Sequence, residues 1–141
     1  MSTLERAIEI AAKAHAGQKD KAGAAYILHP LRVMLSVSGN DEKITAVLHD
    51  VVEDTDIDFA DLANEGFSVE IVEALKCLTK FDGESRFDAA HRAVINQIAR
   101  VVKLADVTDN MDLSRIAVPT EKDYSRLKQY EQVRLILLAE G

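Results

Sequence analysis

Helical patterning runs through almost the whole chain, and this feature limits the possible folds more than any other. Apolar residues recur three and four positions apart, as on one face of a helix. No stretch alternates apolar and polar residues between turn signals, as a half-buried strand does. The pattern predicts helices over residues 2–17, 30–37, 41–52, 58–66, 68–78, 87–111 (as one or two helices) and 119–139. We therefore expect a compact all-α fold of roughly seven or eight helices.

Capping residues set the expected starts of several helices. Ser2, with Glu5 three residues later, has the pattern of a capping box. Asp41, Asp58 and Ser68 each precede an apolar run with helical spacing. Such side chains accept a hydrogen bond from a backbone N–H that has no partner inside the helix. We therefore expect helices to begin at these residues.

Length and composition predict a single soluble domain over residues 1–141. Hydrophobic residues make up 48% of the chain and charged residues 29%, as in an ordinary globular protein. No apolar run reaches the roughly 18 residues of a membrane span, and the first residues lack the pattern of a secretory signal. The single cysteine, Cys77, lies in an apolar helical stretch and is expected in the core. These features predict a cytoplasmic protein that does not bind a membrane.

The charge balance bears on the class of partner. The formal net charge is −7 and the isoelectric point is about 5.0. A nucleic-acid polymer is an unfavourable partner for such a chain because its binding needs a broad basic surface. A small anionic substrate needs only a few local cations and a metal ion. We therefore expect a small-molecule substrate, and the sequence predicts no oligomeric state.

The run His49-Asp50-Val51-Val52-Glu53-Asp54 carries the strongest chemical signal. It places four ionisable side chains in six residues, directly after the apolar stretch 44–48. On a helix, His49 would share a face with Glu53 and Asp50 with Asp54. This spacing predicts two metal ligands followed by two acidic residues near the metal. The alternative is an exposed acidic helix end, since the acidic residues continue beyond the run.

Two other segments offer matching metal ligands. His29 stands before Pro30 at an expected helix start, and Asp106 lies in the apolar helical stretch 101–105. A lone histidine is more often packed or exposed than a ligand, but a buried aspartate needs a partner. Together with His49 and Asp50 they form a set of two histidines and two aspartates. Such a set favours Mn²⁺, Fe²⁺ or Mg²⁺ over structural zinc and suits phosphoryl hydrolysis.

Several other motifs of catalysis are missing from the sequence. There is no Gly-rich phosphate-binding loop and no G-x-S-x-G elbow. The metal-ligand set is therefore the main chemical signal.

Five motifs follow one another along the chain: His15-Ala16-Gly17-Gln18, Tyr26-Ile27-Leu28-His29-Pro30-Leu31, Leu48-His49-Asp50-Val51-Val52-Glu53-Asp54-Thr55, Leu78-Thr79-Lys80 and Val102-Lys103-Leu104-Ala105-Asp106. Their order resembles that in the hydrolase domain of RelA/SpoT-type alarmone enzymes, within the HD-domain phosphohydrolases. The resemblance covers roughly residues 4–138, and the motif around His49 is the most specific.

This resemblance implies an all-helical HD fold and a metal-dependent hydrolase. The implied activity removes the 3′-pyrophosphate from (p)ppGpp and gives GDP or GTP and pyrophosphate. Glu53 and Asp54 match the acidic pair that family members place beside the nucleophilic water. The implied ligands of a Mn²⁺ ion are His29, His49, Asp50 and Asp106.

The resemblance also implies residues that bind the substrate. Lys21 matches a basic loop residue of the nucleotide pocket, and Asn110 matches a residue near the ribose and metal. Arg126 and Tyr130, one turn apart on the last helix, match a late Arg and Tyr that close the pocket. Their alternative is an ordinary surface and core position. Lys80 either points at phosphate or caps the helix that ends near residue 78.

The chain departs from the family pattern at three positions, and this leaves two alternatives open. Asp20 stands where many members have arginine beside the base, Ala25 replaces a frequent proline, and Val107 replaces a basic residue. The first alternative is an HD phosphohydrolase acting on another nucleotide phosphate, such as the 2′-phosphate of NADPH. The second is a catalytically idle domain that binds a nucleotide. The length fits a small, hydrolase-only form.

Overall fold

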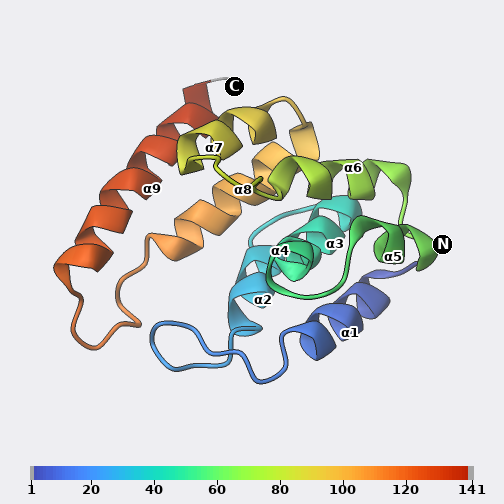
Figure 1. Cartoon of the computed structure of the whole chain (residues 1–141), viewed down its shortest axis with the longest axis horizontal. Helices are drawn as coiled ribbons and strands as arrows, with labels where there is room; N and C mark the ends of the chain where they lie inside the picture. Colours follow the sequence, from blue (N-terminus) through green and yellow to red (C-terminus); the bar gives the residue numbers. More distant parts are fainter. Residues whose placement is uncertain (1, 140–141) are drawn as a thin grey trace.

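The computed structural model describes residues 2–139, which form nine helices and no β-strand, so the predicted all-α fold is confirmed (Figure 1). The only pairing of strand type in this part is an isolated bridge between Lys19 and Ala25. The helices are α1 (Leu4–Ala14), α2 (Leu28–Leu35), α3 (Asn40–Leu48), α4 (Val51–Asp54), α5 (Phe59–Asn64), α6 (Val69–Leu78), α7 (Arg86–Val94), α8 (Gln97–Asn110) and α9 (Glu121–Ala139).

Helices α3 and α8 form the centre of the molecule. Helix α3 contacts α1, α2, α6 and α8, while α8 also contacts α2, α6, α7 and α9. In Figure 1, α9 lies along the opposite side of the molecule from α1. Apolar side chains from both central helices are fully buried in one contiguous core, among them Ile44, Val47, Leu48, Val102 and Val107. Because α2 contacts both α3 and α8, this packing places α2 beside α8.

Two of the predicted capping residues, those of α1 and α3, are wrong by one or two positions. Thr3, not Ser2, caps α1 by accepting a hydrogen bond from the backbone N–H of Arg6. The backbone N–H of Ser2 instead donates to the carbonyl of Gly66, so Ser2 lies outside the helix. Helix α3 begins after Gly39, whose φ of +85° suits glycine. Asp41 therefore lies in the first turn, where its charge favours the helix N-terminus.

The predicted caps of α5 and α6 are confirmed. Asp58 accepts a hydrogen bond from the backbone N–H of Asp61, and the Asp61 side chain accepts from that of Asp58. Ser68 accepts a hydrogen bond from the backbone N–H of Ile71. None of the helices in residues 2–139 combines the length and apolar character needed to cross a membrane.

The predicted helix over residues 41–52 breaks at His49 and Asp50, which separate α3 from α4. In a continuous helix, the carbonyl of Ala46 would accept the N–H of Asp50. Here it accepts the backbone N–H of His49, and the His49 Nδ1 lies 2.5 Å from it. The histidine thus takes the acceptor that the next turn needs. The break turns both His49 and Asp50 toward α2 and α8, where a continuous helix would separate them by about 100°.

Candidate metal centre and adjoining cavity

The four predicted metal ligands meet between α2, the α3–α4 break and α8. Ligand atoms of His29, His49 and Asp50 lie within 4.8 Å of one another. Asp106 joins them, with its Oδ1 atom 2.9 Å from His29 Nε2 and 3.4 Å from His49 Nε2. His29 and His49 are buried and Asp106 is 6% exposed. The structure thus gathers two imidazoles and two carboxylates from residues that are far apart in the sequence.

The chemistry of His49 fits a bound cation. Its Nδ1 must carry the proton, since the Ala46 carbonyl beside it can only accept. Its Nε2 is fully buried and makes no hydrogen bond of good geometry, although it lies 3.0 Å from Asp50 Oδ2. Burial alone would lower the pKa of His49, but the carboxylates of Asp50 and Asp106 raise it well above the ordinary value. A nitrogen and carboxylate oxygens that converge in this way fit a divalent ion.

Further side chains hold His29 and Asp106 in place. Asp109 Oδ2 lies 2.7 Å from His29 Nδ1, and the Arg32 guanidinium donates two hydrogen bonds to the same carboxylate. Although burial opposes this, the bonds from His29 and Arg32 lower the pKa of Asp109 to about 2. Lys103 donates to Asp106 Oδ2 at 3.1 Å. Charged partners from α2 and α8 therefore anchor two of the four predicted ligands. We call His29, His49, Asp50 and Asp106 together the metal-site set.

The sequence interpretation missed Asp109 and Arg32. Asp109 lies three residues after Asp106, so the two carboxylates share a face of α8. This three-residue spacing could have identified Asp109 as a neighbour of the predicted ligand Asp106. Arg32 lies three residues after His29 on α2 and was recognisable by the same rule.

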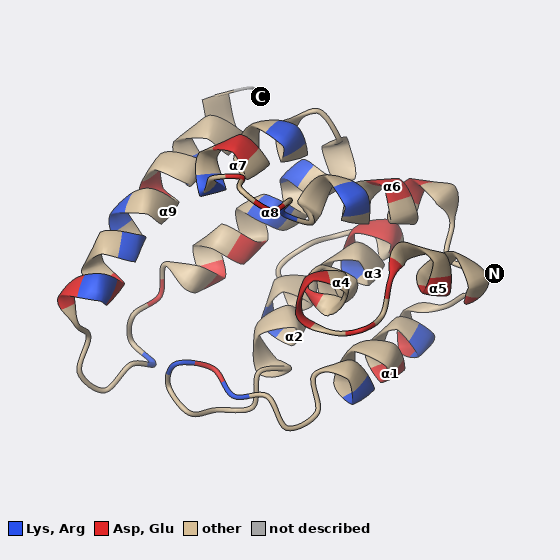
Figure 2. Cartoon of the chain, in the orientation of Figure 1, with Lys and Arg blue, Asp and Glu red and all other residues tan. Residues whose placement is uncertain are grey.

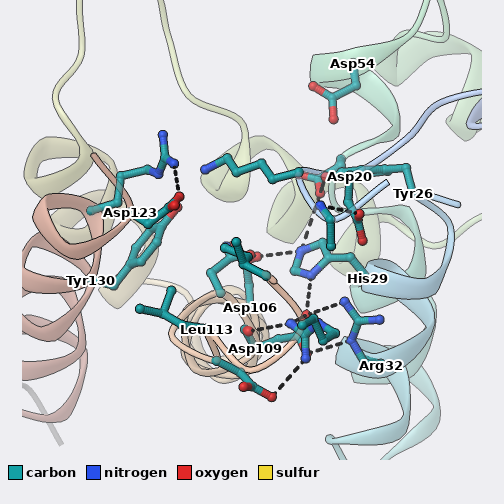
Figure 3. Close-up of a pocket in the computed structure, with 18 of the residues that line it drawn as sticks. Asp20, Tyr26, His29, Arg32, Asp54, Asp106, Asp109, Leu113, Asp123 and Tyr130 are labelled. Atoms are coloured by element: carbon teal, nitrogen blue, oxygen red, sulfur yellow. Dashed lines mark hydrogen bonds and ion pairs between the residues drawn. The ribbon is translucent and has the colours of Figure 1, made fainter. Parts of the chain in front are cut away.

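A cavity of about 600 Å³ opens beside the metal-site set. In Figure 3, His29 and Asp106 lie at its centre, with Tyr130 and Asp123 on one side and Tyr26 on the other. All the residues that the sequence assigns to catalysis and substrate binding line this cavity: Glu53, Asp54, Lys21, Lys80, Asn110, Arg126 and Tyr130. Asn110 also donates to Asp106 Oδ1 at 3.2 Å. The sequence-derived candidates thus lie around one space.

Glu53 and Asp54 extend from α4 at the edge of the metal-site set. Partial burial is the main cause that raises the pKa of each, and the Asp50 carboxylate adds to it. Lys103 and His49 act on Glu53 in the opposite direction. A carboxylate whose pKa moves toward neutrality is a better proton acceptor for chemistry near pH 7.

Basic residues gather around the cavity despite the net charge of the chain. Eight of the 17 Lys and Arg residues line it, from the loop before α2, from α2 itself and from the region of α6–α9 (Figure 2). Arg126 is paired with Asp123 at 2.6 Å. Arg86, which the sequence interpretation missed, stacks over the Tyr130 ring at 4.7 Å. Within residues 2–139, Lys21 and Lys80 form no ion pair.

The carboxylate of Asp20 is used within its own loop. Its Oδ1 accepts hydrogen bonds from the backbone N–H groups of Ala22 and Ala24, both at 2.9 Å. These two hydrogen bonds stabilise the loop locally. Lys21, the next residue, has a lowered pKa because of burial and of the nearby Arg126.

Comparisons with known proteins agree with this geometry. The family model described as HD domain matches residues 7–109. A probable GTP pyrophosphokinase of Mycobacterium leprae is 34% identical over 94% of this chain. Guanosine-3′,5′-bis(diphosphate) 3′-pyrophosphohydrolases of Aquifex aeolicus and Vibrio cholerae are 33% and 34% identical over 77% and 79% of it. The chain spans only 17–18% of the length of these three relatives.

A solved structure shares the fold. It is described as a metazoan ortholog of SpoT that hydrolyzes ppGpp, and it matches with a TM-score of 0.77 at 23% identity. The match covers 98% of this chain and 86% of the other. These similarities confirm the resemblance to RelA/SpoT-type enzymes that the motifs predict.

Proposed function

This chain belongs to the HD-domain family, and we propose that it is a metal-dependent phosphohydrolase that removes the 3′-pyrophosphate from (p)ppGpp. The observation that carries the proposal is the convergence of two imidazoles and two carboxylates beside a cavity lined by basic residues. The names of the Aquifex and Vibrio relatives support the choice of substrate. The products are GDP or GTP and pyrophosphate.

His29, His49, Asp50 and Asp106 would hold the metal, which we propose is Mn²⁺. Two nitrogen and two oxygen donors without a thiolate suit Mn²⁺, Fe²⁺ or Mg²⁺ better than structural zinc. When bound, such an ion supplies Lewis-acid polarisation of a phosphoryl oxygen and lowers the pKa of water. The protein fixes the donors beforehand through the hydrogen bonds to His49 and Asp106.

Glu53, assisted by Asp54, orients the attacking water and accepts its proton. Both line the cavity and follow the Asp50 ligand within one turn. Their raised pKa values suit a general base that works near neutral pH. The water oxygen bonds to the phosphorus attached to the ribose 3′-oxygen while the water proton passes to Glu53. The bond from this phosphorus to the 3′-oxygen breaks, and the 3′-oxygen takes up a proton to become the hydroxyl of GDP or GTP.

The basic residues neutralise the phosphate groups of the substrate. Lys21 and Lys80 form no ion pair within residues 2–139, so their charges are available to an anion. Arg126 and Tyr130 act from α9, and Asn110, which donates to the Asp106 ligand, would contact the ribose. We place the protein in the cytoplasm with a small nucleotide as its partner, not a nucleic-acid polymer.

The test is incubation of the pure protein with ppGpp and Mn²⁺, followed by measurement of GDP and pyrophosphate. Glu53→Gln should abolish turnover while Mn²⁺ still binds. Glu131→Gln, at an exposed position of α9, should behave as the wild type. Absence of products from a protein with bound Mn²⁺ would overturn the substrate assignment.

The same assay decides between the alternatives. Faster release of phosphate from NADPH than of pyrophosphate from ppGpp would favour the 2′-phosphate reading. If the wild type and Glu53→Gln were equally inactive on all nucleotides but bound ppGpp, the chain would be a binding domain.

A further inference from the structure

Asp50 differs from the other three residues of the metal-site set in the group that holds it. Asp109 holds His29, the Ala46 carbonyl holds His49, and Lys103 and Asn110 hold Asp106. For Asp50, the Tyr26 hydroxyl donates a hydrogen bond of 2.5 Å to Oδ2. Within residues 2–139 this is the only hydrogen bond to the Asp50 carboxylate from outside the set.

The oxygen that accepts this bond is the one that faces the two histidines. Asp50 Oδ2 lies 3.0 Å from His49 Nε2 and 3.8 Å from His29 Nε2. The terminal torsion of an aspartate is broad, so a carboxylate without a partner can rotate. The hydroxyl therefore fixes the atom that points into the site.

The Tyr26 ring is itself held in a row of aromatic rings. Its centroid lies 5.0 Å from that of His15 and 5.9 Å from that of His29, and the His29 ring lies 5.3 Å from that of His49. His15 is fully buried, and its Nδ1 lies 2.8 Å from Gln18 Oε1. The backbone N–H of Tyr26 donates to the Gln18 carbonyl at 2.9 Å. The end of α1 thus sets the position of the hydroxyl.

We infer that Tyr26 is a positioning residue that holds Asp50 Oδ2 in place for the metal. The inference rests on the metal site of the proposed function. The hydroxyl orients the ligand oxygen toward the two histidines, so the donor is in place before the cation binds.

The test is Tyr26→Phe, which removes the hydroxyl and keeps the ring between His15 and His29. Isothermal titration should show Mn²⁺ affinity reduced about ten- to a hundredfold, the usual effect of losing the outer partner of a ligand. The circular dichroism spectrum of the metal-free protein should match the wild type. Tyr124→Phe, on an exposed residue of α9, is the matched control and should leave the affinity unchanged.

The outcomes separate this inference from the choice of substrate. Mn²⁺ binding is measured without a nucleotide, so a failure to hydrolyse ppGpp leaves the test intact. With an active substrate and saturating Mn²⁺, kcat should fall and KM should stay near its wild-type value. Wild-type Mn²⁺ affinity in Tyr26→Phe, with or without a raised KM, would overturn the inference. A wild-type protein that bound no Mn²⁺ would overturn it together with the metal site.

Discussion

The two sides of the cavity are built in different ways. One side, the metal wall, consists of the metal-site set. His29, Asp50 and Asp106 line the cavity, and His49 is buried beside them. Hydrogen bonds with neighbouring residues hold all four. The other side, the cation wall, consists of Lys21, Lys80, Arg86 and Arg126, which are exposed or half-buried. Of these four, only Arg126 forms an ion pair within residues 2–139.

The difference indicates that one wall is built to bind the metal and the other to bind the anionic substrate. The metal wall comes from helices packed in the core, so its geometry is fixed before any ligand arrives. The cation wall comes from a loop and from helix ends, and its like charges repel one another until an anion enters. We therefore expect substitutions in the metal wall to change the chemical step and those in the cation wall to change substrate affinity.

The largest expected effect comes from Asp106→Asn in the metal wall. The amide keeps the shape but removes the charge that Lys103 and the two histidines share. We expect no measurable Mn²⁺ binding by titration calorimetry. We also expect a loss of turnover of at least about a hundredfold, since the metal contributes several kcal/mol to the transition state. Asp56→Asn, at an exposed position outside the cavity, should retain both properties.

A smaller effect is expected from Asp109→Asn, which alters the support of the metal wall. The substitution weakens the contact with His29 Nδ1 and the pairing with Arg32. Mn²⁺ affinity should fall about ten- to a hundredfold. Asp112→Asn is a close control because Asp112 contacts Arg115 but no residue of the metal wall. Equal affinities of the two variants would contradict the role given to Asp109.

The cation wall is probed by Lys21→Met, which keeps the aliphatic stem and removes the charge. A charge-assisted hydrogen bond to phosphate contributes about 1.5–3 kcal/mol, so KM for ppGpp should rise by roughly ten- to a hundredfold. Mn²⁺ affinity should not change. Lys128→Met, at an exposed position of α9, is the control. A fall in Mn²⁺ affinity for Lys21→Met would show that the two walls are not independent.

The smallest effect concerns the segment that carries Lys80 and Arg86. Arg92 donates to the Glu84 carboxylate and to the carbonyls of Lys76 and Thr79, which fixes this segment. The bond from Arg92 lowers the pKa of Glu84 below its ordinary value. The folded state is therefore stabilised above the unfolded pKa of this group, and the stabilisation is lost as the pH falls through the folded value.

Glu84→Gln should accordingly have a lower melting temperature than the wild type at pH 7, and the difference should shrink below about pH 4. Thermal unfolding followed by circular dichroism across that range measures this. A difference that stayed constant with pH would mean that the charge of Glu84 is not involved.

Much of the fold and of the candidate site was predictable from local sequence. Spacing of apolar residues located the helices, and the composition of residues 49–54 pointed to a metal. Each signal acts within one or two helical turns, which is the range over which periodicity and capping operate. The assignment of ligand, catalytic and substrate-binding roles remains a prediction that the substitutions above test.

The tertiary structure decided which distant segments of the sequence meet at the site. His29 meets Asp106 and Asp109 across 77 and 80 positions of sequence, and only the packing of α2 on α8 brings them together. The break at His49 arises because its imidazole occupies the Ala46 carbonyl that the next helical turn requires. By itself, the sequence determined the helices and the residue types at the site, because those depend on near neighbours. Packing alone decided their convergence and the place of the Tyr26 hydroxyl beside Asp50.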